Sequence, residues 1–197
     1  MNKQNTLTLV ESLLIDYASG SLPLALEVLV ESHISINPSS AKSIRMLLQI
    51  GGALMENSDP ISMSEGSFER LMDEIDGGQD EEQDEEIAYS EVSNDNDKLP
   101  LPLRNFISEA AFPKNWRRIG IGLSEQTVDF GDEFGNAKLY RIAPGCGVPS
   151  HSHDGNEVSL VLAGGFTDEY GSYGPGDISI QETGAVHKPV ADADGEC

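Results

Sequence analysis

Three of the four histidines in this 197-residue chain lie in its C-terminal half, at positions 151, 153 and 187. His151 and His153 are separated by one residue, so on a β-strand both imidazoles point to the same face. Glu157 follows four residues after His153, and in a bulged strand its carboxylate can reach that face too. Three imidazoles and one carboxylate suit Zn²⁺, Fe²⁺, Mn²⁺, Ni²⁺ or Cu²⁺, and ligand softness does not select among these metals. The alternative interpretation is that these histidines serve only as surface or core residues.

The segment that must position these residues has the pattern of an all-β domain. Short apolar runs occur at 119–123, 127–130, 138–142, 158–162, 166–170 and 177–180, and glycines and prolines separate them. Many short strands with regular turn signals are typical of a β-sandwich or barrel.

Two motifs in this segment resemble those of the cupin family. The spacing Gly145-x5-His151-x-His153-x3-Glu157-x6-Gly164 matches the first cupin motif at every fixed position. The spacing Gly176-x5-Glu182-x-Gly184-x2-His187 resembles the second motif, with Glu182 where proline is usual. The resemblance implies a jelly-roll-like cupin barrel with His151, His153, Glu157 and His187 as metal ligands. Few residues follow His187, so we expect a barrel that closes incompletely, with an open β-edge, or a sequence that is a fragment.

Residues 1–76 have the pattern of a small all-α domain. Apolar residues recur at helical spacing over 7–17, 24–36, 44–54 and 68–75. We expect Gly20 to end the first helix, Ser39 or Ser40 to cap the third, and Gly51-Gly52 to interrupt it. The second helix is apolar nearly all round, which places it centrally. Four short helices form a thin core, and such a core often depends on a metal or a partner protein.

Charge divides the chain between these two parts. The formal net charge is −22, and half of this excess lies within residues 73–98. We interpret 77–98 as an acidic linker, because like charges repel and few apolar groups offset the entropy of ordering. The sequence therefore predicts an α+β protein of two domains: a helical bundle at 1–76 and a cupin domain at 99–197.

Composition also excludes several classes of function. The acidic balance argues against direct nucleic-acid binding and against a polybasic membrane contact. No apolar run is long enough for a membrane span, and the N-terminus has no signal-peptide pattern. The chain has two cysteines, Cys146 and Cys197, which argues against a disulfide scaffold, so we expect a cytoplasmic protein. Cys146 can approach the metal site or serve as a turn residue, and we expect Cys197 to be exposed.

The whole chain resembles the ChrR-type anti-sigma factors, which consist of a small helical domain, a linker and a cupin. The resemblance includes the segments LLIDYASG at 13–20, ESHISI at 31–36 and GGALME at 51–56. It implies that residues 7–76 bind an extracytoplasmic-function sigma factor and keep it from RNA polymerase. It also implies that the cupin binds zinc and is needed for release under oxidative stress, such as singlet oxygen. The acidic balance fits a partner with basic, DNA-binding domains.

The chain departs from this family at the zinc site of the helical domain. The family uses an early histidine and a His-x3-Cys-x2-Cys run, whereas here His33 is followed by Asn37 and Ser40. The place of the early histidine falls near Thr8, and no histidine precedes His33. Neutral amide and hydroxyl groups are poor replacements for thiolates. We therefore expect no zinc in the N-terminal domain and a capping or packed role for His33.

Two other functions fit the same residues. Many cupins are iron or manganese enzymes, such as dioxygenases, and a site with three histidines and one glutamate leaves room for water and substrate. Bound iron with O₂ consumption would favour an enzyme, and bound zinc without turnover would favour the regulator. The third interpretation is a cupin that binds a small ligand and whose helices form a homodimer.

Overall fold

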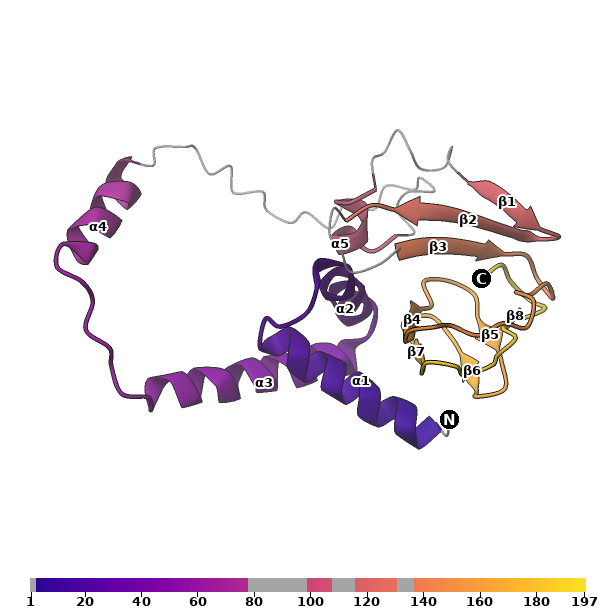
Figure 1. The fold of residues 1–197 in the computed structure, drawn as a ribbon, viewed down its shortest axis with the longest axis horizontal. Coiled ribbons are helices and arrows are strands. Elements are labelled where there is room, and N and C mark those ends of the chain that lie inside the picture. The colour runs from indigo at the N-terminus through magenta and orange to yellow at the C-terminus, as the bar shows by residue number, and fades with distance from the viewer. Residues whose placement is uncertain (1–2, 78–98, 108–115, 131–136) are drawn as a thin grey trace.

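The computed structural model describes residues 3–77, 99–107, 116–130 and 137–197, and it contains helices followed by a β-rich part (Figure 1). This architecture confirms the predicted α+β fold with an N-terminal helical part and a C-terminal cupin-like part. The predicted acidic linker lies almost wholly outside the described residues, as do the glycines at 131 and 135 that separate two of the predicted strands. The proposed domain boundaries at 76 and 99 therefore stay a prediction.

Four helices precede the linker. They are α1 (Lys3–Ala18), α2 (Leu24–Ile36), α3 (Pro38–Glu56) and α4 (Ser67–Gly77). Within the part of the chain that the structure describes, no helix has both the length and the apolar character needed to cross a membrane.

The start of α3 differs from the expected one. The cap is Asn37 rather than Ser39 or Ser40, because its Oδ1 accepts hydrogen bonds from the backbone N–H groups of both serines, at 3.1 and 3.3 Å. Pro38 then takes the first helical position, where its fixed φ and missing N–H do no harm. The predicted interruption at Gly51-Gly52 is wrong, because α3 continues through both glycines to Glu56.

Only α1, α2 and α3 form the bundle. Helix α4 has no buried residue, and Figure 1 shows it apart from the other helices, at the far end of an extended connection. The expected four-helix core is therefore a three-helix core. The apolar side chains of α4 remain exposed.

The β-rich part contains a short helix, α5 (Leu101–Arg104), and antiparallel strands in three small sheets. The order β1-β2-β3 joins Arg117–Gly120, Leu123–Val128 and Ala137–Ile142. The pair β4-β7 joins Glu157–Leu160 and Ile178–Gln181, and the order β6-β5-β8 joins Ser172–Tyr173, Phe166–Thr167 and Val190–Ala191.

Several strand boundaries differ from the predicted ones. The expected strand at 119–123 contains the β1–β2 turn, where Gly122 adopts φ 64°. The expected strand at 166–170 ends at Thr167, because Asp168 begins a turn. After His187, β8 pairs with β5, and Cys197 exchanges backbone hydrogen bonds of 2.7 and 2.9 Å with Ile142 of β3. Cys197 is therefore half-buried rather than exposed.

The helices and the β4–β7 pair share one hydrophobic core. Its buried members are Leu13, Leu14, Val30, Ile44, Ile178 and Ile180, and Val158 and Leu160 pack against them. Because side chains alternate along a strand, the residues between these apolar positions of β4 and β7 face away from the helices. A second cluster joins Val28 of α2 to Leu99 and Leu103, so the chain before β1 also packs on the helices.

His33 makes a polar contact across the same interface. Its side chain is 3% exposed, and Nδ1 lies 2.7 Å from the backbone oxygen of Gly176. A carbonyl oxygen only accepts, so Nδ1 carries the proton, and Nε2 accepts from the Ser40 hydroxyl at 2.7 Å. His33 therefore has the packed role expected from the sequence, in its neutral form.

Burial lowers the pKa of His33 below its ordinary value, and the Gly176 hydrogen bond and the charge of Asp177 offset this effect in part. A histidine with a lowered folded-state pKa binds fewer protons when folded, so its stabilising contribution is complete above about pH 6.5 and is lost as the pH falls below that value. We expect the stability difference between the wild type and His33→Gln to be largest at pH 8 and smaller at pH 5.5. Urea unfolding followed by circular dichroism measures it. A difference that grows on acidification would contradict this prediction.

Candidate metal centre

The backbone brings His151 and His187 together from separate segments. The two residues form an antiparallel bridge, and each donates its N–H to the carbonyl of the other at 3.1 Å. The N–H of Gly184 donates to the carbonyl of His153 at 2.9 Å, which holds the next histidine beside the same segment. Glu157 is the first residue of β4 and pairs with Gln181 of β7.

The four predicted ligand side chains converge. One donor atom from each of His151, His153, Glu157 and His187 lies within 4.8 Å of all the others. The Nε2 atoms of His151 and His187 are 3.2 Å apart, and Nε2 of His153 lies 2.5 Å from Oε2 of Glu157. The His187 side chain is 2% exposed, whereas those of His153 and Glu157 are about one-third exposed. The cluster is thus buried on the side of His187 and open to solvent on the side of His153 and Glu157.

The hydrogen bonds on the outer side of two rings determine what faces the centre. His151 Nδ1 lies 2.8 Å from the carbonyl oxygen of Pro149, and His187 Nδ1 lies 3.3 Å from Oδ2 of Asp168. Both oxygens are acceptors, so in the neutral rings both Nδ1 atoms carry the proton and both Nε2 atoms present a lone pair.

Two lone pairs that face each other at 3.2 Å repel unless a cation or a proton lies between them. Nε2 of His153 faces Oε2 of Glu157 without the geometry of a hydrogen bond. Three imidazole Nε2 atoms and one carboxylate that converge in this way fit a divalent metal ion. The cluster can therefore hold a metal, and its ligand types do not select which one.

Asp168 contacts the candidate ligand His187, and sequence reasoning missed it. Its side chain is 0% exposed, and Oδ1 accepts from the N–H groups of Tyr170 and Gly171 at 2.8 and 3.0 Å. Oδ2 faces His187 and also accepts from Nε2 of Gln181 at 3.4 Å. The Asp-x-x-Gly sequence signals a turn, but nothing in it places that turn beside a histidine 19 residues away.

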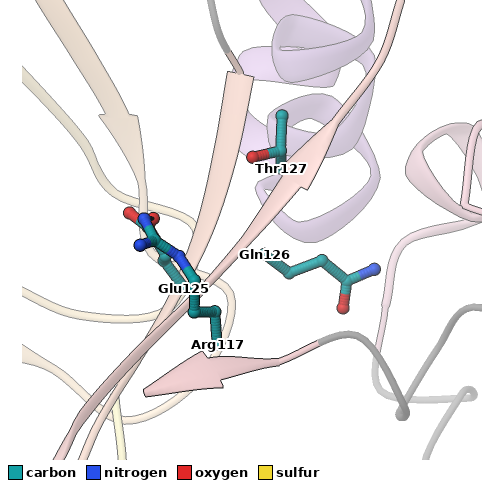
Figure 2. A pocket seen from close by; sticks show the side chains of 4 residues that line it. All are labelled: Arg117, Glu125, Gln126 and Thr127. Carbon is teal, nitrogen blue, oxygen red and sulfur yellow. Dashed lines mark hydrogen bonds and ion pairs between the residues drawn. The ribbon is translucent and has the colours of Figure 1, made fainter. Parts of the chain in front are cut away.

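Two other features lie outside this cluster. Cys146 packs against the cluster of Leu123, Ile142 and Ala191 and is not among the grouped donors, which fits a turn residue. Figure 2 shows a pocket on β1 and β2 in which Arg117 and Glu125 point to one side and Gln126 to the other. The Arg117 guanidinium holds the pKa of Glu125 below its ordinary value, and Lys138 at 3.2 Å contributes. The pocket contains a structural ion pair and none of the predicted ligands.

We expect Asp168→Asn to weaken zinc binding by about 10- to 100-fold, the usual effect of losing an outer hydrogen-bond partner of a ligating histidine. The neutral amide no longer stabilises the Nδ1–H form of His187 as a carboxylate does. Competition with a chromophoric chelator measures the affinity. Glu182→Gln is the matched control, because Glu182 is an exposed carboxylate in the loop after β7 that leads to His187. Equal affinities of the two variants would show that Asp168 does not support His187.

Comparison with known proteins identifies the family. Residues 111–197 match the family model described as the ChrR cupin-like domain. The chain is 33% identical over 188 residues to the anti-sigma-E factor ChrR of Cereibacter sphaeroides, covering 95% of this chain and 84% of that protein.

A solved structure agrees with this match along nearly the whole chain. The crystal structure of Rhodobacter sphaeroides SigE in complex with the anti-sigma ChrR contains a chain that superposes with a TM-score of 0.75 at 30% identity. The superposition covers 95% of this chain and 92% of that one, so it includes the helices as well as the cupin-like part. This chain belongs to the ChrR family of anti-sigma factors.

Proposed function

We propose that this protein is a cytoplasmic anti-sigma factor that binds an extracytoplasmic-function sigma factor through helices within residues 7–76. The similar chain of known structure was solved in complex with SigE. The observation that carries the proposal for this chain is a large set of apolar side chains that its own fold leaves uncovered.

These apolar side chains lie on the last turns of α3, in the connection, and on α4. In α4, Phe68, Leu71, Met72 and Ile75 are 38–63% exposed and share one helix stripe. In α3, Leu54 and Met55 are at least 70% exposed, and Ile61 of the connection is 93% exposed. Exposed apolar groups in this number mark a protein-binding surface.

An isolated helix as short as α4 is marginal in water, because propensity alone does not offset the cost of nucleation. The helix has 11 residues and no buried side chain of its own. A partner that receives its apolar stripe supplies the missing packing, as in other complexes in which an amphipathic helix occupies a groove. A sigma factor is the partner that the family relationship favours.

The second part of the proposal concerns the metal. We infer that His151, His153, Glu157 and His187 bind one divalent metal, with zinc as the expected ion. Bound zinc would hold the four side chains in one geometry. Oxidative stress, such as singlet oxygen, is the expected signal.

We expect Leu71→Asp to weaken sigma-factor binding by about 30-fold or more, because it places a charge at the centre of the apolar stripe. Asp73→Asn is the matched control, since it changes charge on the opposite face of α4 and should leave the affinity nearly unchanged. The partner is first identified by co-purification with the tagged full chain and mass spectrometry. Affinities of the purified pair are then measured by titration calorimetry. Equal effects of the two substitutions, or recovery of no sigma factor, would contradict the proposal.

A second prediction separates sensing from binding. We expect His187→Ala to abolish stoichiometric zinc binding and to blunt induction by singlet oxygen, because the most buried ligand is lost. Sigma-factor binding should persist at the level of the zinc-free wild type, since α4 and the end of α3 do not contact His187. Zinc content is measured by atomic emission, and induction by a reporter of the sigma factor. Normal induction in this variant would exclude the metal centre as the sensor.

A further inference from the structure

The His33 ring connects two segments that are 143 residues apart in the chain. Its Nδ1–H donates to the Gly176 carbonyl, and its Nε2 accepts from Ser40, each at 2.7 Å. One ring thereby fixes the corner between α2 and α3 and joins that corner to the turn before β7. A buried ring with both nitrogens satisfied is held in a single orientation.

The backbone of Gly176 lies directly against this corner. Gly176 adopts φ +83°, and a Cβ atom at this position would lie 2.9 Å from Cγ2 of Ile36 and 3.9 Å from Cβ of Asn37. A side chain would therefore push the corner away, and the positive φ would be strained as well. Glycine at this position permits the close approach that the His33 hydrogen bond requires.

The turn that His33 contacts continues into the strand pair that carries a candidate metal ligand. The N–H of Gly176 donates to the carbonyl of Val161 at 2.8 Å, and the N–H of Val161 donates to the carbonyl of Asp177 at 3.0 Å. From these bonds the β4–β7 ladder runs without interruption to the pair of Glu157 and Gln181. The ladder connects the turn with the metal-facing carboxylate over four residue pairs.

The other face of this ladder packs on the helices. Ile178 and Ile180 lie in the same buried cluster as Leu13, Val30 and Ile44. Displacement of the β4–β7 pair therefore changes the surface on which α1, α2 and α3 rest, and displacement of the helices changes the support of Glu157. Packed interfaces of this kind adopt discrete arrangements rather than deforming continuously.

We propose that His33 is an interdomain latch that couples the metal centre to the helices, so that metal binding tightens the hold on the sigma factor. The coupling rests on the function proposed above, whereas the latch itself does not. Metal at Glu157 stabilises the ladder, the ladder holds the Gly176 turn in reach of His33, and the latched corner orients α3. The hydrogen bonds of His33 and the Asn37 cap thus add to the shared hydrophobic core in holding the small helical part on the strands.

The first experiment tests the latch in the full chain without sigma factor. Hydrogen exchange of residues 24–36 and 174–181 is compared by mass spectrometry in the wild type and two variants. The glutamine amide in His33→Gln lies near the position of Nε2 and leaves no donor at the position of Nδ1, so the hydrogen bond to Gly176 is lost. We therefore expect about fivefold faster exchange in both segments, the factor for one lost hydrogen bond. His33→Asn retains a donor near the Nδ1 position and should restore exchange close to that of the wild type. Equal exchange in all three proteins would overturn the latch.

A substitution from the other side of the interface provides an independent check. Gly176→Ala leaves His33 unchanged but introduces the clashing Cβ, so it should accelerate exchange in residues 24–36 as His33→Gln does. Ser43→Ala is the control, because its hydroxyl donates to the Ser39 carbonyl within α3 and not across the interface. Faster exchange in the control, or an unchanged α2 in Gly176→Ala, would also overturn the latch.

The second experiment tests the coupling. The affinity for the co-purified sigma factor is measured with and without Zn²⁺ for the wild type and His33→Gln. We expect zinc to tighten binding at least about fivefold in the wild type, the lower end of typical coupling between sites, and to change it less than twofold in the variant. An equal zinc effect in both proteins, or none in the wild type, would overturn the coupling. Failure to bind any sigma factor would refute the proposed function and this coupling, while the exchange data would still decide the latch.

Discussion

The pairing of β4 with β7 is the constraint on which the rest of the structure depends. Because side chains alternate along each strand, one face of this pair carries Val158, Leu160, Ile178 and Ile180 toward the helices. The other face carries Glu157 toward the histidines, with Ser159 donating to its Oε1 at 3.1 Å. A slip of one residue in register would exchange these faces. The apolar side chains would then leave the hydrophobic core, and the carboxylate would no longer face the histidines.

We expect packing and hydrogen bonds rather than zinc to hold the helical part together, because Asn37 and Ser40 stand where the resemblance places thiolates. A structural zinc site contributes on the order of 10 kcal/mol to folding, whereas one hydrogen bond contributes about 1 kcal/mol. The His33 bonds and the Asn37 cap are therefore far weaker than such a site. The larger compensation is the burial of Leu13, Leu14, Val30 and Ile44 against β7, which makes the helices depend on the cupin-like part.

The distribution of apolar residues follows from the same dependence. The faces of α1, α2 and the first half of α3 are covered within the chain, whereas α4 and the end of α3 are uncovered. The described fold thus has one apolar surface for its own strands and another for a partner. The two surfaces do not overlap, so a partner can bind while the helices remain docked on β4 and β7.

Local patterns in the sequence determined which elements form and which residues can bind a metal. Periodicity identified α1, α2 and α4, and the His-x-His spacing with Glu157 and His187 identified the residues that converge. These features depend on residues near one another in the chain or on a motif with regular spacing, so they can be read without coordinates. The family relationship was accessible in the same way, because it rests on motif residues and domain order.

Tertiary structure alone decided how these elements are joined. The Asn37 cap, by contrast, is local, because its Oδ1 accepts from the N–H groups of Ser39 and Ser40, and α3 passes through Gly51-Gly52 without any atom packed against the glycines. The role of Asp168 depends on a turn that returns to His187 across 19 residues, and that of His33 on a carbonyl 143 residues away. Backbone carbonyls and turn carboxylates occur throughout any chain, so no local pattern indicates which of them a buried histidine will meet.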